Sequence, residues 1–95
     1  MTNLKNRLNK DIADVRWQYL MSHVQRDAIV FVTKHLNLIE VGIAVAKDDV
    51  NSVQHWISKA LIHKPSPEQL TTWNADPSIS FNTLILQPFV LIQLI

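Results

Sequence analysis

The central segment from Leu36 to Val50 combines a long apolar run with one narrow polar edge. At helical spacing its apolar side chains cover most of a cylinder. The remaining polar stripe consists of Asn37, Glu40, Ala44, Lys47 and Asp48. A strand is the alternative, because β-branched residues recur at every second position from Ile39 to Val45. The length of the segment and the helix signal that follows it favour a helix covered by protein on nearly every side.

Two helices are predicted before this segment. An apolar stripe at spacings of four, four and three is formed by Leu4, Leu8, Ile12 and Val15. Asn3 can cap the helix that carries this stripe. The stripe changes phase at Trp17, so we expect a break near Val15 to Trp17 and a second helix ending near Gln25. The pattern favours Trp17 as a core residue.

Strands are predicted where apolar residues run on without helical spacing. Ala28 to Thr33 is rich in β-branched and aromatic residues and fits a strand buried on both faces. Leu61 to Lys64 is a short candidate strand that Pro65 would end, because proline has no backbone N–H to continue a ladder. From Pro77 to Ile95 no residue is charged, which predicts two strands or one strand bent at Pro88.

The paired acids Asp48 and Asp49 stand before a predicted helix from about Asn51 to Ala60. Either Asp49 or Asn51 can cap this helix, and Asn51 also has Gln54 at capping-box spacing. Carboxylates at a helix N-terminus are favoured by the backbone dipole alone, which favours a structural role over a catalytic or metal-binding one. The predicted buried stripe of this helix is Val50, Val53, Ile57, Ala60 and Leu61.

The clearest local signal in the chain marks the start of another helix. Ser66 is a strong N-cap residue, Pro67 suits the first helical position, and Gln69 stands three residues after the cap. In this helix Leu70 and Trp73 face the interior. The Asn74–Pro77 segment ends it.

These elements predict an α+β fold, with a small, mostly antiparallel or mixed sheet and four or five helices packed on it. The 95 residues correspond to one globular domain over residues 1–95. The C-terminal strand region is apolar on both faces, so helices on both sides or a second subunit must cover the sheet. We therefore expect a homodimer whose interface includes Phe89, Leu91 and Leu94.

The charge balance argues against nucleic acid as a partner. Nine Lys and Arg residues against eight Asp and Glu residues give a net charge of +1 and no strong field. The basic residues at the start of the chain are Lys5, Arg7, Lys10 and Arg16. Because Asp11 and Asp14 interleave them, a solvated face is favoured over a phosphate-binding one.

The sequence also favours a cytoplasmic protein that does not enter a membrane. Charged residues stand near the start, where a signal peptide needs an apolar core. Polar residues interrupt the segment from Pro77 to Ile95 too often for a transmembrane helix. The chain has no cysteine, which is compatible with an intracellular location.

No set of residues with specific reactive spacing is found. The four histidines, none at HxH or HxxxH spacing from another, are His23, His35, His55 and His63. We therefore expect no metal and no other cofactor. Gly42 is the only glycine, which excludes a GxSxG nucleophile elbow and a glycine-rich phosphate loop.

Several landmarks occur in an order that is typical of one family. They are Trp17, the Asn37–Val41 run, Asp48–Asp49, Trp56 and the closing Pro88–Gln93 run. Over nearly its whole length the chain resembles a bacterial family catalogued as a domain of unknown function, number 2288. The resemblance implies a helix in the central segment, which is alanine-rich in the family. It implies no activity, cofactor or catalytic residue.

The leading functional hypothesis is a small noncatalytic interaction or regulatory protein. Trp56 and Trp73 are candidate anchors for a protein partner, although core packing is favoured for each. The alternative is a small enzyme or ligand-binding domain. Its site would be assembled from Glu40, Asp48, Asp49 and His55, which must then converge on one cleft. Nucleic-acid binding through the N-terminal helix is the third hypothesis.

Overall fold

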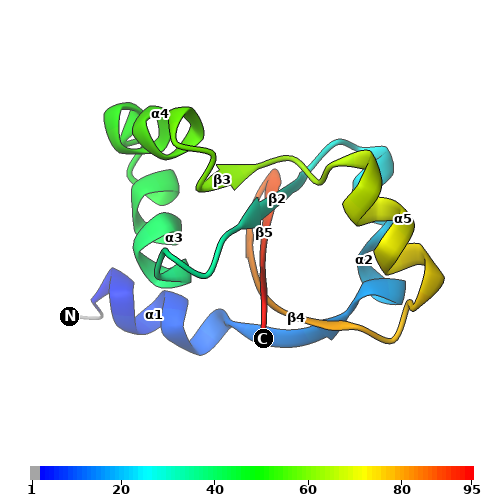
Figure 1. Cartoon of the computed structure of the whole chain (residues 1–95). Coiled ribbons are helices and arrows are strands. Elements are labelled where there is room, and N and C mark those ends of the chain that lie inside the picture. Colours follow the sequence, from blue (N-terminus) through cyan, green and yellow to red (C-terminus); the bar gives the residue numbers. More distant parts are fainter. Residues whose placement is uncertain (1–2) are drawn as a thin grey trace.

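The computed structural model describes residues 3–95, which form an α+β fold as predicted (Figure 1). Within these residues five strands make one mixed sheet in the order β1-β4-β5-β2-β3. The strands are β1 (Ala13–Arg16), β2 (Ile29–Val32), β3 (Ile62–His63), β4 (Ser80–Leu86) and β5 (Phe89–Leu94). The helices are α1 (Leu4–Asp11), α2 (Trp17–Gln25), α3 (Leu38–Ala46), α4 (Val50–Ser58) and α5 (Pro67–Ala75). Strands β2 and β5 are parallel, and the other neighbouring strands are antiparallel.

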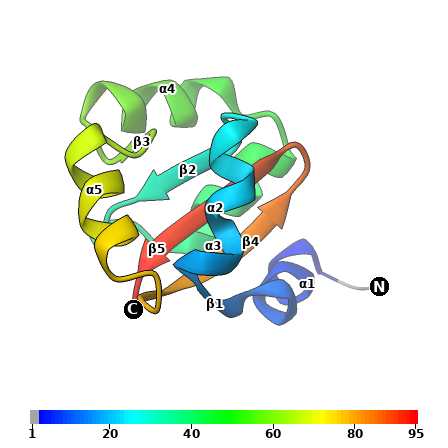
Figure 2. The same ribbon diagram turned by 90° about the vertical axis from the view of Figure 1, so that its right-hand side faces the viewer.

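Helices of the same chain cover both faces of the sheet. Figure 2 shows α2 in front of the sheet, with α3 behind it. One face carries the α3-side core, whose buried members are Leu8, Val32, Leu38, Ile39, Val41, Ile62, Leu84 and Leu91. The other carries the tryptophan-side core, whose buried members are Trp17, Leu20, Ile29, Phe31, Trp73, Phe81, Val90 and Ile92. Neighbouring strand residues such as Leu91 and Ile92 enter opposite cores, because side chains alternate along a strand.

The central segment is a helix, as predicted, and its ends are set by local chemistry. The Asn37 side chain accepts hydrogen bonds from the backbone N–H groups of Ile39 and Glu40, which caps the start of α3. The helix ends earlier than predicted, at Ala46, and Asp48 just beyond it has a backbone φ of +57°. The assignment of Ala44 to the polar stripe was wrong, because this residue is buried in the packed helix.

Residues 13–16 correct the prediction that the first apolar stripe continues as helix to Val15. Helix α1 stops at Asp11, and the following residues pair with β4 from Ala13 opposite Thr83 to Arg16 opposite Ser80. The helical spacing of Val15 is therefore coincidental. The backbone hydrogen bonds of this segment are made with a strand near the other end of the chain.

The prediction for α4 was right about its start and wrong about its burial. The helix begins at Val50, and its cap is Asp49, one of the two predicted cap residues. No residue of α4 is buried, although Val50, Val53 and Ile57 were predicted to form a buried stripe. Beyond the helix, Ala60 is exposed and Leu61 is half-buried. The apolar stripe exists, but the chain covers it only in part, since Val53 packs against the α3-side core and Val50 and Ile57 are exposed.

The remaining elements follow the predictions closely. Helix α5 starts with a complete capping box, in which Ser66 and Gln69 each bond the other's backbone N–H. Helix α2 ends at Gln25, and β2 and β3 lie within the predicted ranges. The C-terminal segment forms two strands joined at the Gln87–Pro88 turn.

Candidate functional site

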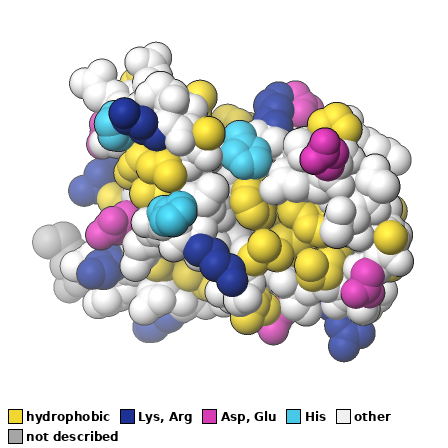
Figure 3. Space-filling model, viewed as in Figure 1, with side chains coloured by type: hydrophobic (Ala, Val, Ile, Leu, Met, Phe, Trp, Pro, Cys, Tyr) yellow, Lys and Arg dark blue, Asp and Glu magenta, His cyan; other side chains and the backbone are white. Residues whose placement is uncertain are grey.

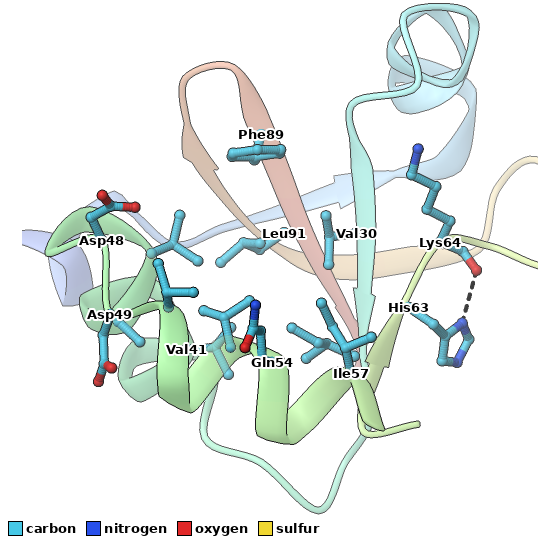
Figure 4. A pocket seen from close by; sticks show the side chains of 15 residues that line it. Val30, Val41, Asp48, Asp49, Gln54, Ile57, His63, Lys64, Phe89 and Leu91 are labelled. Carbon is cyan, nitrogen blue, oxygen red and sulfur yellow. Dashed lines mark hydrogen bonds between the residues drawn. The ribbon is translucent and has the colours of Figure 1, made fainter. Parts of the chain in front are cut away.

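A groove with a volume of about 570 Å³ opens between α4 and the sheet (Figure 4). We call it the α4 groove. Its apolar lining consists of Val30, Val41, Ala44, Val45, Val50, Val53, Ile57, Ile62, Phe89 and Leu91. Its polar lining consists of Asp48, Asp49, Gln54, His63 and Lys64. The groove is thus mainly apolar and draws on α3, α4, β2, β3 and β5.

The groove exists because α4 packs on its neighbours without closing over the sheet. Helix α4 contacts α3 and β3, and half-buried Trp56 packs against the α3-side core. The floor of the groove includes the buried side chains of Val41 and Leu91. These are core residues of α3 and β5.

Three large apolar side chains at the edge of the groove remain open to solvent. Val50 is 51% exposed, Ile57 is 56% exposed and Phe89 is 43% exposed. We call these three residues the apolar rim. Figure 4 places Phe89 across the groove from Ile57, with Leu91 and Val30 between them. A ligand in the groove would therefore meet apolar surface on both sides and on the floor.

Polar and charged side chains mark the two ends of the groove. Asp48 and Asp49 lie at one end, and His63 and Lys64 lie at the other (Figure 4). Lys64 forms an ion pair with Asp27, and both side chains are largely exposed. His63 Nδ1 lies 2.8 Å from the Lys64 carbonyl oxygen. The charges stand at the ends, and the side chains between them are apolar except for Gln54.

Asp49 is held at the start of α4 by Ser52. Its carboxylate accepts a hydrogen bond of 2.7 Å from the Ser52 hydroxyl and one of 3.2 Å from the Ser52 backbone N–H. The hydroxyl bond, followed by the backbone bond, lowers the pKa of Asp49. Asp49 is therefore an ionised helix cap, and Asp48 is the acid at this end with no such role.

The four residues of the predicted ligand or catalytic site do not all meet. Asp48 and Asp49 line the α4 groove, but Glu40 and His55 do not. Glu40 lies in the first turn of α3, at the opposite end of that helix from Asp48, and His55 is an exposed residue of α4. Within residues 3–95 no three His, Asp or Glu side chains are grouped so that they could hold a metal ion.

The candidate partner anchors lie in different environments. Trp73 is buried, with its ring centre 5.0 Å from that of Trp17 and 4.9 Å from that of Phe81. The Trp17 indole N–H donates a 2.8 Å hydrogen bond to Asn74 Oδ1. Trp73 is therefore part of the tryptophan-side core and is not available to a partner, whereas Trp56 is half-buried beside the α3-side core.

The three residues of the predicted dimer interface are also separated. Leu91 is only 1% exposed in the α3-side core, and Leu94 packs against the tryptophan-side core. Phe89 is on the apolar rim. Only Phe89 of these three thus offers substantial surface to a second molecule.

The sequence pattern indicates the apolar stripe that lines one wall of the groove, but it does not indicate the groove itself. The spacing of Val50, Val53 and Ile57 marks an apolar helix face, and such a face is normally buried. A signal for the opposite wall was also present, since the apolar segment containing Phe89 and Leu91 was recognised as having more apolar surface than a strand needs. What the sequence does not show is the gap between the two walls.

The surface does not carry one concentrated basic region on the face seen in Figure 3. Side chains of both charges are scattered there around hydrophobic ones. Four basic residues were predicted as a possible nucleic-acid surface. Lys5, Arg7 and Lys10 are exposed on α1, whereas Arg16 belongs to β1. Among the described helices none is long and apolar enough to cross a membrane.

Comparison with known proteins identifies a family. No curated protein matches the chain. The NMR solution structure of PA1075 from Pseudomonas aeruginosa is similar, with 28% sequence identity and a TM-score of 0.80, over 98% of this chain and 85% of that one. The family model described as "Protein of unknown function (DUF2288)" matches residues 3–94. This match confirms the family that the order of the sequence landmarks indicated. The chain belongs to the DUF2288 family.

Proposed function

We propose that this protein is a noncatalytic interaction module and that the α4 groove is the surface on which it binds a protein partner. The observation that carries the proposal is the apolar rim standing over a buried apolar floor. Exposed apolar surface that is contiguous and edged by polar residues is typical of interaction sites. The partner segment would have apolar side chains in its centre and charges toward its ends.

The free energy gained by burying the three rim side chains indicates how strong such binding can be. Complete burial of a large apolar side chain contributes about 1.5–3 kcal/mol relative to full exposure. The three rim residues are each about half exposed, so together they have about 2–4 kcal/mol left to gain. Association costs at least about 4 kcal/mol. The half-buried lining residues Val30, Val45 and Val53 and the charged ends of the groove must therefore contribute for binding to be stable.

The state of the charged groups supports binding over catalysis. Asp49 is bonded to Ser52 as a helix cap, and Lys64 is paired with Asp27. Glu40 and His55, which the catalytic hypothesis needs, lie outside the groove. The groups that remain at the groove are suited to orienting a partner by charge.

Site-specific photo-cross-linking in the native cells tests this function. A photoreactive amino acid replaces Ile57 on the apolar rim in one variant and Ile85 on β4 in a control variant. The two residues match in type and in exposure, at 56% and 54%, and Ile85 does not line the groove. We expect protein adducts from position 57 and not from position 85. Absence of protein adducts at 57, or equal adducts at both positions, would refute the proposal.

A small apolar ligand is a second candidate for the groove. Its volume of about 570 Å³ falls in the range of about 300–1,000 Å³ that small-molecule sites occupy. Native mass spectrometry of protein from its own cells distinguishes the two candidates. An added mass of a few hundred daltons that is lost on substituting Val30→Phe, which fills the floor, would favour the ligand. A chain measured without any added mass would exclude the ligand, and the protein partner would remain as the candidate.

A further inference from the structure

We propose that the partner that fills the α4 groove is a second copy of this chain, related to the first by a twofold axis. This inference rests on the proposed function of the groove as a protein-binding surface. It names the occupant and the orientation in which it binds. The axis lies in the plane of the groove opening and perpendicular to the long direction of the groove.

The charges at the two ends make the groove complementary to itself. Asp48 stands at one end and Lys64 at the other, and the side chains between them are apolar except for Gln54 (Figure 4). A twofold rotation about the proposed axis places each end over the opposite end of the second copy. Asp48 of each copy then faces Lys64 of the other, at two equivalent contacts. Opposite charges meet at both ends, so no other protein is needed to satisfy them.

The same rotation places the apolar rim against itself. Val50, Ile57 and Phe89 of one copy lie opposite the same three residues of the second copy. All three are about half exposed, and all three border this one groove. Two Phe89 rings that meet at an axis can adopt the offset or edge-to-face arrangements that aromatic pairs favour. Apolar surface thus meets apolar surface in the middle of the contact.

The ion pair within the chain does not oppose this arrangement. Lys64 is paired with Asp27, but the two side chains are 64% and 71% exposed. Exposed ion pairs contribute little to stability, so Lys64 can share its charge with Asp48 of a second copy at small cost. Asp49 stays with Ser52, because both of its carboxylate oxygens already accept hydrogen bonds there.

Charge exchange between copies tests the inference. In Asp48→Lys, and separately in Lys64→Asp, both twofold contacts join like charges, so we expect self-association to weaken at least about tenfold. When the two variants are mixed, both contacts join opposite charges again, and a heterodimer should form with wild-type affinity. The double variant D48K/K64D should also dimerise. Sedimentation equilibrium measures each dissociation constant, with Asp14→Lys on β1 as a charge-matched control.

Two results would overturn the inference. One is a wild type that stays monomeric at high micromolar concentration, and the other is a mixture of D48K and K64D that associates no better than either variant alone. Neither result refutes the proposed function if position 57 still cross-links to a different protein. A protein that neither self-associates nor forms protein adducts at position 57 would refute the twofold inference and the proposed function together.

A cysteine variant gives an independent measurement, because the chain contains no cysteine. With Phe89→Cys, the twofold axis brings two thiols together, so mild oxidation should give a disulfide-linked dimer. Ile85→Cys, at a similarly exposed site outside the groove, should link much more slowly. Equal linking rates would contradict the proposed axis.

Discussion

Among single residues, Gly42 shows how closely α3 packs on the sheet. A Cβ atom added there would lie 2.6 Å from Leu84 Cδ2 and 3.4 Å from Leu8 Cδ1. Glycine inside a helix costs about 1 kcal/mol relative to alanine. At this position the glycine faces the side chain of Leu84, which is fully buried. Close approach of the helix to β4 thus explains a residue that helix propensity alone would disfavour.

We predict that Gly42→Ala destabilises the protein despite the better helix propensity of alanine. Forcing extra volume into a packed core costs about 1–3 kcal/mol, which exceeds the gain of about 1 kcal/mol in propensity. Urea unfolding measures the difference. In a Leu84→Ala background the added methyl group has space, so the same substitution should become neutral or stabilising. An equal cost in both backgrounds would show that the contact with Leu84 is not the cause.

The ionised cap at Asp49 predicts a specific dependence of stability on pH. Hydrogen bonds from Ser52 lower the pKa of Asp49 in the folded protein. The resulting stabilisation is fully present above the unfolded pKa of about 3.9 and is lost as the pH falls through the folded value. Asn at this position caps a helix equally well but does not titrate. The stability of the wild type relative to Asp49→Asn should therefore decrease below about pH 4.

Denaturant midpoints of the two proteins at a series of pH values measure this effect. All other carboxylates are common to the two proteins, so the difference isolates position 49. Parallel curves between about pH 5 and pH 2 would contradict a role for the ionised form.

Among the elements, α5 offers the most direct test of a local interaction. Ser66→Ala removes the side-chain acceptor for the Gln69 backbone N–H and leaves half of the capping box. We expect a loss of about 1 kcal/mol in unfolding free energy, without a change of fold. Ser22→Ala, at an exposed position inside α2, is the matched control and should be neutral or slightly stabilising. Equal effects of the two substitutions would mean that Ser66 does not cap α5.

The elements that could be predicted from the sequence are those fixed by neighbours in the chain. The caps at Asn3 and Ser66 were predicted, and Asp49 was one of two candidates for the cap of α4, because each cap bond joins residues two or three positions apart. The strand at residues 13–16 was missed because its partners are in β4, beginning with Ala13 opposite Thr83. No local pattern contains that information.

The groove was missed for a related reason. Its wall on α4 was recognised as an apolar stripe, and burial was the physically sensible expectation for Val50 and Ile57. Whether a stripe is covered depends on how far α4 stands from the sheet, and the packing of α3 and β3 against α4 sets that distance. Asp48 and Asp49 were identified as candidates, but their separation from Glu40 and His55 follows only from the folded arrangement.

For the whole molecule, the covering of both sheet faces changes which substitution probes assembly. Leu91 is a natural choice from the sequence, yet it lies in the α3-side core and is 1% exposed. A buried unpaired charge is strongly destabilising, so Leu91→Asp should unfold the protein. Phe89→Asp, at the exposed rim, should keep the fold and lower self-association. Circular dichroism and sedimentation separate the two effects, and a folded Leu91→Asp monomer would contradict this view of the core.

The two cores share strands, which predicts that the whole chain unfolds as one unit and is a single domain. Leu84 and Phe81 of β4 enter opposite cores, as do Leu91 and Ile92 of β5. Separating the cores would expose one face of the central strands, so neither core is expected to persist without the other. The three tryptophans provide reporters, since Trp17 and Trp73 belong to the tryptophan-side core and Trp56 packs against the α3-side core.

Fluorotryptophan labelling lets ¹⁹F NMR follow each of these reporters through a denaturant titration. We expect one common midpoint and no intermediate resonance, as in two-state unfolding. A lower midpoint for Trp56 alone would show that α4 detaches before the sheet unfolds. In that case the α4 groove would be a mobile element of the fold, and its open form could not be treated as a preformed binding surface.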